Sequence, residues 1–219
     1  MKLGNDIFAA LKQMDEEATR LQDGCETGLR GYAAFRKGSY SLRGNRYEDA
    51  ITDRLAELLR LRGYECEVRP RYPTGTLVCD LLVKGPGLDR MWIEVKGAWR
   101  NCIPDEDHNC YGAYPNSNFP KHLRAAAEDV GKVRANVAAK DASRVGMLLI
   151  GFDVMNHVRL SITDRDLKVV RLRASGWTEA SAEWSDCAWL GGRVLCHFWW
   201  TTIQRVESTL REPVPVMSS

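Results

Sequence analysis

The 219-residue sequence contains no apolar run approaching the ~18 residues of a membrane-spanning helix. Near the start of the chain, Asp6 and Lys12 interrupt the apolar residues, so no signal peptide is expected. Internal repeats and low-complexity segments are also missing from the sequence. The length allows one domain with a full hydrophobic core and some additions, and no contact with a membrane is expected.

The seven cysteines lack the even number and the regular spacing of a disulfide framework. Scattered thiols of this kind are typical of a reducing compartment, so we expect a cytoplasmic protein. Cys102, His108, Cys110 and His122 could be assembled into a zinc site, but their spacings match no compact zinc finger. The cysteine pattern therefore favours neither a disulfide scaffold nor a structural zinc ion.

A large excess of charge is missing as well. The net charge of +2 and the pI near 8.2 are not those of a protein that binds nucleic acid by bulk charge. Residues 28–47, however, contain no acid, and we call them the basic segment. Its basic residues are Arg30, Arg36, Lys37, Arg43 and Arg46, and its aromatic residues are Tyr32, Phe35, Tyr40 and Tyr47. The segment could hold phosphates and stack on bases, or it could be a solvated connector with a few core aromatics.

Two apolar runs further along the chain carry charged residues at regular positions. Residues 77–83 form an apolar run with Asp80 in its middle, and residues 91–96 alternate with a period of two. The connection between them, residues 84–87, contains the Gly and Pro of a tight turn. We therefore expect an antiparallel pair in which Asp80 and Glu94 meet, with Glu94 and Lys96 on one face of their strand.

A carboxylate among Leu and Val side chains needs a partner, because an isolated buried charge costs several kcal/mol. A hard cation such as Mg²⁺, bound by one or two carboxylates and a substrate phosphate, would neutralise Asp80 and Glu94. The alternative is that either acid forms a structural ion pair with Lys96 or Lys84. The arrangement of two carboxylates and an ammonium group suits metal-assisted hydrolysis of phosphodiesters.

A third acid, Glu48, lies on a predicted helix over residues 46–62, which Gly63 should end. The apolar stripe of this helix comprises Tyr47, Ile51, Leu55, Leu58 and Leu59. At ~100° per residue, Glu48 projects within the apolar arc and so faces the sheet. Its alternative role is that of a capping-box glutamate with Asn45 as the N-cap.

The remaining elements complete an α-β-β-β-α-β order. Residues 65–71 precede the two strands, and residues 145–152 form a short buried strand at the end. Between them, residues 121–140 show a helical pattern with one apolar face, made of Leu123, Ala126, Ala127, Val130, Val133 and Val137.

By element order and by the set Glu48, Asp80, Glu94 and Lys96, residues 45–152 resemble the PD-(D/E)XK nuclease superfamily, which includes the restriction endonucleases. Cys79 stands where the family often has proline, a position without chemistry. The resemblance implies an α/β fold with a restriction endonuclease-like core, in which helices flank a central mixed sheet.

The resemblance also implies roles for the motif residues. Asp80 and Glu94, with the Val95 carbonyl, would hold Mg²⁺ or Mn²⁺, which polarises the phosphate and lowers the pKa of a bound water. Lys96 would orient or deprotonate that water and offset charge in the transition state. Glu48 would be an outer-shell or second-metal ligand.

Further basic residues are candidates for binding phosphates. Lys121, Arg124 and Lys132 on the second helix could reach the nucleic-acid backbone, although a solvated helix face is the commoner explanation for such residues. In the basic segment the candidates are Arg36, Lys37, Arg43 and Arg46.

Two extensions flank the predicted core. Residues 1–44 are expected to form a helical and basic extension, whose amphipathic helix over 3–21 could pack on the core or on a second subunit. Residues 45–153 form the core, with a loop insertion at 97–120. Residues 154–219 extend the same domain, contain five of the seven tryptophans and could include a strand over 194–201. These tryptophans could be additional core, or a surface for bases or a partner.

The sequence thus predicts a Mg²⁺-dependent nuclease that cleaves DNA, most simply as an endonuclease. One alternative is a nuclease that cleaves RNA, or a defence or toxin effector that an activating protein partner switches on. Another alternative is a catalytically silent nucleic-acid-binding module on the same fold. The motif residues do not separate the DNA nuclease from the RNA-cleaving or partner-activated one, but they disfavour the silent module, which would not need all four polar groups.

Neutralising Arg36, Lys37 and Arg43 together tests the basic segment. Binding of nucleic acid should weaken regardless of sequence, and its salt dependence should flatten by roughly one phosphate contact per residue removed. Fluorescence anisotropy over a range of salt concentrations measures both effects. An unchanged slope of log affinity against log salt would identify the segment as a connector only.

Overall fold

The computed structural model describes residues 2–21, 46–85, 87–100, 103–104, 110–111, 119–138, 143–153, 163–187 and 192–203. Within these residues, six strands form one mixed sheet in the order β1-β2-β3-β6-β8-β7. The strands are β1 (Glu65–Val68), β2 (Leu81–Gly85), β3 (Leu88–Arg100), β6 (Arg144–Asp153), β7 (Thr178–Cys187) and β8 (Gly192–Thr202). Strands β3 and β6 are parallel, whereas the other neighbouring strands pair antiparallel.

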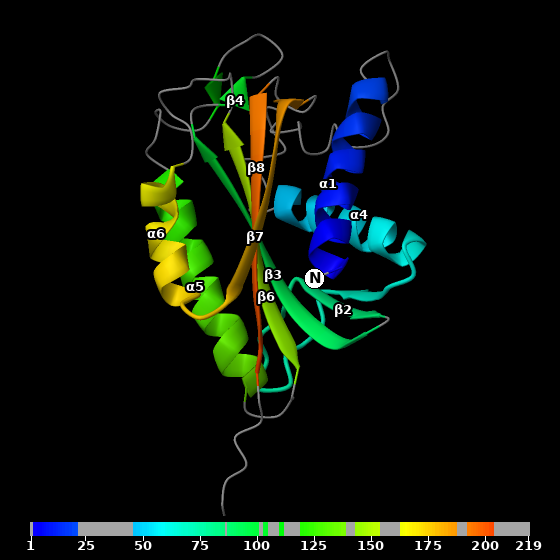
Figure 1. Ribbon diagram of the computed structural model, residues 1–219, viewed down its shortest axis with the longest axis vertical. Coiled ribbons are helices and arrows are strands. Elements are labelled where there is room, and N and C mark those ends of the chain that lie inside the picture. Colours follow the sequence, from blue (N-terminus) through cyan, green and yellow to red (C-terminus); the bar gives the residue numbers. More distant parts are fainter. Residues whose placement is uncertain are drawn as a thin grey trace, which may run out of the picture.

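Helices cover both faces of this sheet (Figure 1). Helices α1 (Lys2–Leu21) and α4 (Arg46–Leu61) lie on one face, and α5 (Phe119–Ala138) and α6 (Asp164–Arg173) lie on the other. The prediction of a mixed sheet flanked by helices is confirmed. None of the helices in the described part of the chain has both the length and the apolarity that crossing a membrane requires.

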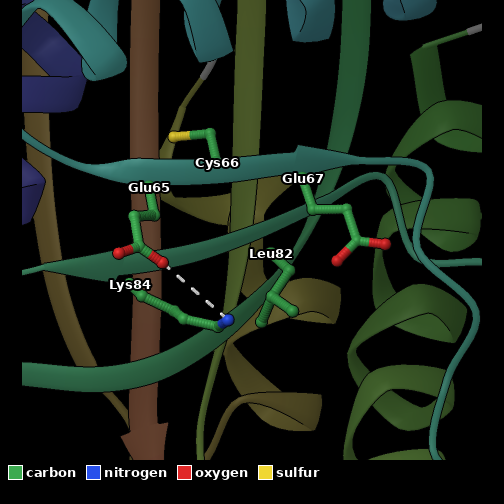
Figure 2. Close-up of a pocket in the computed structure, with 5 residues that line it drawn as sticks. All are labelled: Glu65, Cys66, Glu67, Leu82 and Lys84. Carbon is green, nitrogen blue, oxygen red and sulfur yellow. Dashed lines mark ion pairs between the residues drawn. The ribbon is translucent and has the colours of Figure 1, made fainter.

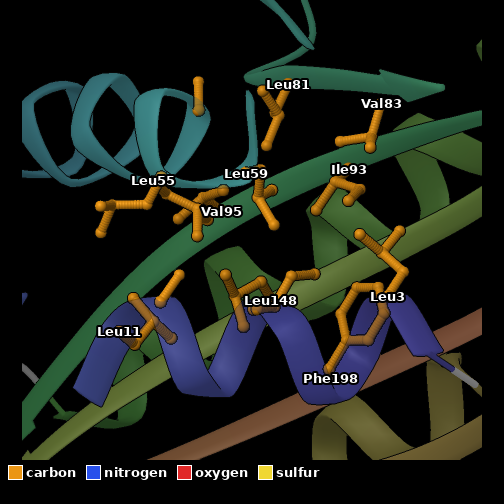
Figure 3. Close-up of a cluster of buried hydrophobic side chains, with 14 of the residues drawn as sticks. Leu3, Leu11, Leu55, Leu59, Leu81, Val83, Ile93, Val95, Leu148 and Phe198 are labelled. Carbon is orange, nitrogen blue, oxygen red and sulfur yellow. The ribbon is translucent and has the colours of Figure 1, made fainter. Parts of the chain in front are cut away.

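The main hydrophobic core lies between the sheet and the pair α1 and α4 (Figure 3). Ile51, Leu55, Leu58 and Leu59 of the predicted α4 stripe point into it, and α1 contributes a stripe of its own, made of Leu3, Ile7, Leu11 and Met14. Full burial of one such side chain contributes ~1.5–3 kcal/mol. Helix α1 therefore belongs to the central core of the domain and is more than an appendage to it.

Helix α4 ends as its sequence predicts. Gly63 has a φ of +88°, a conformation that costs a glycine nothing. It lets the Tyr64 N–H turn back to donate to the Leu59 carbonyl. The chain then enters β1 directly beside the helix.

Strand β2 begins later than predicted. The expected strand over 77–83 starts at Leu81, and the preceding residues belong to a hairpin in which Arg71 bridges to Val78. At its tip the Tyr72 N–H donates to the Leu77 carbonyl. Leu77 and Val78 are 50% and 41% exposed, so these two residues are apolar without being buried in a strand. Asp80 consequently lies at a bend immediately before β2.

Strand β3 pairs with β2 as predicted and alternates as predicted. Leu81 lies opposite Ile93, and Val83 lies opposite Met91. Ile93 and Val95 face the main core, whereas Glu94 and Lys96 reach groups on α5. The strand continues to Arg100, which is four residues into the predicted loop insertion at 97–120. A short pair, β4 (Ile103–Pro104) and β5 (Cys110–Tyr111), lies within the same stretch.

The C-terminal part adds α6, β7 and β8 to the sheet and its outer layer. Strand β8 confirms the expected strand over 194–201, whereas α6 and β7 are elements without a sequence prediction. Trp199 is 1% exposed in the core beside α5 and α6, and Trp200 stacks on Phe198 in the main core. For these two tryptophans the interpretation as additional core is confirmed.

Gly146 on β6 gives a test of the packing between β6 and β8. A methyl group at this position would lie 2.8 Å from Phe198 Cε2 and 3.3 Å from the Trp199 carbonyl oxygen. Gly146→Ala should therefore destabilise the fold by ~1–3 kcal/mol through overpacking. Gly131→Ala in α5 is the matched control, because its added methyl group has no neighbour within 4 Å. The control should gain ~0.4–1 kcal/mol. Urea unfolding measures both, and equal stabilities would contradict the packing.

Candidate functional site

The site is built where β2 stops and β3 continues. Pairing between these strands ends at Leu81 and Ile93, so the next outward-pointing N–H groups of β3 need other acceptors. The Val95 N–H donates to Asp80 Oδ2 at 2.7 Å, and the Gly97 N–H donates to Glu48 Oε1 at 3.1 Å. Two carboxylates thus take the place of strand carbonyls along one edge of β3.

Glu94 points from β3 toward α5. Its side chain is 3% exposed, and Lys132 Nζ lies 2.7 Å from Glu94 Oε1. The Tyr72 hydroxyl donates to the same oxygen, so the hairpin between β1 and β2 also holds this carboxylate. Lys132 Nζ lies over the Tyr72 ring at 5.6 Å from the centroid.

Lys96 lies between two acids from different helices. Its Nζ is 3.1 Å from Glu48 Oε2 on α4 and 3.5 Å from Asp129 Oδ2 on α5. All three side chains are less than one-fifth exposed. The ammonium group therefore joins the two helical layers at the edge of the sheet.

Burial sets the pKa values of the site acids. Desolvation, together with repulsion from Asp80, raises the pKa of Glu94 to about 8, although Lys132 and Tyr72 oppose this shift. Desolvation also raises the pKa of Glu48 and of Asp129, and the attraction of Lys96 only partly offsets it.

Burial has the opposite effect on the pKa values of the two lysines. Burial alone would lower the pKa of Lys96, but attraction to Glu48 and Asp129 outweighs burial and raises it. Burial would likewise lower the pKa of Lys132, and the hydrogen bond to Glu94 raises it. Both side chains are therefore ammonium ions near neutral pH.

The donor set suits a divalent cation in type and in charge. With all groups ionised, four carboxylates and two ammonium groups leave an excess of two negative charges. Among the described residues, however, no three His, Cys, Asp or Glu side chains are grouped so that they could hold a metal ion together. Mg²⁺ is commonly held by one or two carboxylates, with waters and substrate phosphate as the other ligands. Asp80 and Glu94 fit that pattern.

The structure brings together the four residues of the predicted motif. Glu48, Glu94 and Lys96 lie in the contacts just described, and Asp80 binds the Val95 N–H. The alternative ion pairs with Lys84 and Lys96 are not those observed. Lys84 lies 4.0 Å from Glu65, Lys96 contacts Glu48 and Asp129, and Glu94 contacts Lys132. Asn45, the other half of the alternative capping box, lies outside the described residues.

The predicted phosphate-binding residues are placed less completely. Arg36, Lys37 and Arg43 lie outside the described residues, and the structure describes only the backbone of Arg46. Lys121 is exposed in the first turn of α5. Lys132 is 29% exposed and forms the ion pair with Glu94, so it belongs to the site itself.

Tyr72 and Asp129 are site residues that the sequence did not reveal. Asp129 lies three residues after Ala126 and four before Val133, so helical spacing places it beside the apolar face of α5. That position is the signal that could have identified it. Tyr72 has no such signal, because only the turn at Leu77 brings it beside Glu94.

A separate pocket of about 210 Å³ lies on β1 and β2 (Figure 2). Its lining residues are Glu65, Cys66, Glu67, Leu82 and Lys84, none of which belongs to the site. Glu65 and Lys84 face each other across it.

Comparison of the chain with protein-family models, with curated proteins and with solved structures found no match. The chemistry of the site therefore has to be inferred from its own residues.

The raised pKa of Glu94 predicts a pH dependence of stability in buffer without divalent ions. The ordinary pKa of a glutamate carboxyl group is 4.5, whereas that of Glu94 in the folded protein is about 8, so the folded state binds more protons between these values. The free energy of unfolding should therefore fall as pH rises through this window, by up to about 1.4 kcal/mol per pH unit for one proton.

Glu94→Gln should remove this contribution, because the amide does not titrate. Urea unfolding at about pH 5 and about pH 8 gives the change in stability for each protein. Glu128→Gln, which alters an exposed acid on α5, should behave like the wild type. A Glu94→Gln protein with the wild-type pH dependence would contradict the assignment.

Proposed function

We propose that this protein is a metal-dependent nuclease that hydrolyses phosphodiester bonds in DNA. The observation that carries the proposal is the arrangement at the free edge of β3. There, Asp80 and Glu48 bind backbone N–H groups, while Glu94 and Lys96 project from the same strand into a buried cluster of opposite charges. A cluster of this kind lowers folding stability, so a functional role explains it better than a structural one.

In this proposal Asp80 and Glu94, with the Val95 carbonyl, hold Mg²⁺ or Mn²⁺. When bound, the ion polarises the scissile phosphate and supplies an acidified water as the nucleophile. Tyr72 supports this role, because its hydroxyl holds Glu94 from the side of the hairpin. Such outer contacts orient a ligand before the ion arrives.

Lys96 acts mainly through its charge. Its raised pKa keeps it protonated, and Glu48 and Asp129 fix the ammonium group from two sides. A fixed cation beside the attacked phosphate stabilises the negative charge that develops in the transition state. The function of a general base, which the sequence left open, is disfavoured because a protonated amine cannot accept a proton.

The proposal extends to the fold. Apart from the short pair β4 and β5, the order α4, β1, β2, β3, α5, β6 agrees with the predicted α-β-β-β-α-β order, which supports a restriction endonuclease-like core. The site residues lie on β3, on α4 and α5, and at Asp80 just before β2, which supports this proposal. DNA is the proposed substrate, and RNA cleavage or activation by a protein partner is the competing form of the same chemistry.

Purified protein should cleave duplex DNA in the presence of Mg²⁺ or Mn²⁺, and single-stranded DNA and RNA should be assayed in parallel. Asp80→Ala should abolish cleavage, and Lys96→Ala should reduce the rate by about 10² or more. Lys96→Arg should retain much of the activity, because it preserves the charge although it cannot act as a base.

Asp89→Asn is the matched control, since it alters an exposed acid at the start of β3, the strand that carries Lys96. It should cleave at the wild-type rate. Cleavage of RNA alone would reassign the substrate. Wild-type rates in both Asp80→Ala and Lys96→Ala would overturn the proposed site, and binding without cleavage by the wild type would favour a silent module.

A further inference from the structure

Lys132 makes the shortest ion pair of the site. Its Nζ is 2.7 Å from Glu94 Oε1, compared with 3.1 Å between Lys96 and Glu48. The two partners differ in burial, because Glu94 is 3% exposed and Lys132 is 29% exposed. The carboxylate is therefore fixed inside the protein, while the ammonium group is at the border with solvent.

The carboxylate of Glu94 also accepts a hydrogen bond from a second side chain. Tyr72 donates its hydroxyl to the same oxygen, so Glu94 keeps a hydrogen bond if Lys132 leaves. The lysine is anchored differently, through its backbone, since the Lys132 carbonyl accepts from Asn136 Nδ2 in α5. Its four-carbon side chain can thus change direction without a change in the helix.

A divalent cation on Glu94 and the Lys132 ammonium group would compete. Both cations are attracted to one buried carboxylate, and two cations on the same carboxylate repel each other strongly in a poorly solvated site. The ammonium group is also the compact cation that suits a phosphate oxygen. A nucleic acid that delivers its phosphate together with the ion offers Lys132 a new partner.

We propose that Lys132 neutralises Glu94 in the metal-free protein, and that the ion displaces it onto a phosphate of the nucleic acid. The inference rests on the proposed function, because it assumes that Glu94 is a metal ligand. The Lys132 side chain then has two positions. On Glu94 it opposes binding of the ion, and on a phosphate it favours binding of the nucleic acid. The free protein therefore binds the ion weakly, and the ion and the nucleic acid bind cooperatively.

The test measures binding of Mn²⁺ alone by electron paramagnetic resonance, without nucleic acid and above pH 8, so that the Glu94 carboxyl group is ionised and protons do not compete with the ion. Lys132→Met should bind Mn²⁺ at least about tenfold more tightly than the wild type, because the competing charge is gone. Lys132→Arg keeps the charge and should stay near the wild type. Lys168→Met, an exposed lysine on α6, is the matched control and should not change the affinity.

A second measurement follows DNA binding with Ca²⁺ as the ion, with the DNA checked for integrity afterwards. Lys132→Met should bind DNA more weakly, and its salt dependence should be shallower by about one phosphate contact. Opposite changes in the affinities for ion and DNA are the signature, since a lysine that only stabilises the fold would not produce them.

The outcomes separate this inference from the function on which it rests. If the wild type binds Mn²⁺ and Lys132→Met binds it equally or less tightly, the exchange is overturned while the metal site stands. If Lys132→Arg gains affinity as Lys132→Met does, charge is not the competitor and the exchange is again overturned. If no variant binds Mn²⁺, the metal site itself is wrong. Unfolding curves for each variant confirm that all are folded.

Discussion

The site depends on two hydrogen-bond donors of the backbone that no neighbouring strand can satisfy. Once β2 has ended, the N–H groups of Val95 and Gly97 still need acceptors, because an unpaired buried N–H is costly. Asp80 and Glu48 meet this need with carboxylate oxygens. The acids are therefore held by the geometry of the sheet, and the charges that they bring determine which further residues gather around them.

Those charges explain why two lysine side chains lie against this buried cluster. Glu48, Glu94 and Asp129 are desolvated, and each has a raised pKa as a result. Lys96 and Lys132 limit the cost, but they do not remove it. Replacing a buried cluster of ion pairs by apolar residues is often neutral or stabilising, so the cluster does little to stabilise the fold.

Local patterns in the sequence predicted most of the elements that carry the site. The amphipathic pattern of α4 and α5 and the alternation of β3 involve residues only a few positions apart. Such patterns can be recognised from the sequence alone. The strand predicted over 77–83 begins only at Leu81, because Leu77 and Val78 are apolar and yet exposed. Strand β7 gave little signal, since its small and polar residues suit the edge of a sheet. Tyr72 reaches Glu94 only through tertiary structure, which no periodicity records.

The position of β8 in the sheet has a consequence for biosynthesis. This strand comes last in the described chain, yet it lies between β6 and β7 and pairs with β6 along ten residues, from Arg144 to Asp153. A ribosome therefore delivers β2, β3 and β6 well before the strand that completes their sheet. Until β8 is present, the edge of β6 that pairs with it is open, and an open strand edge is prone to pair with other chains.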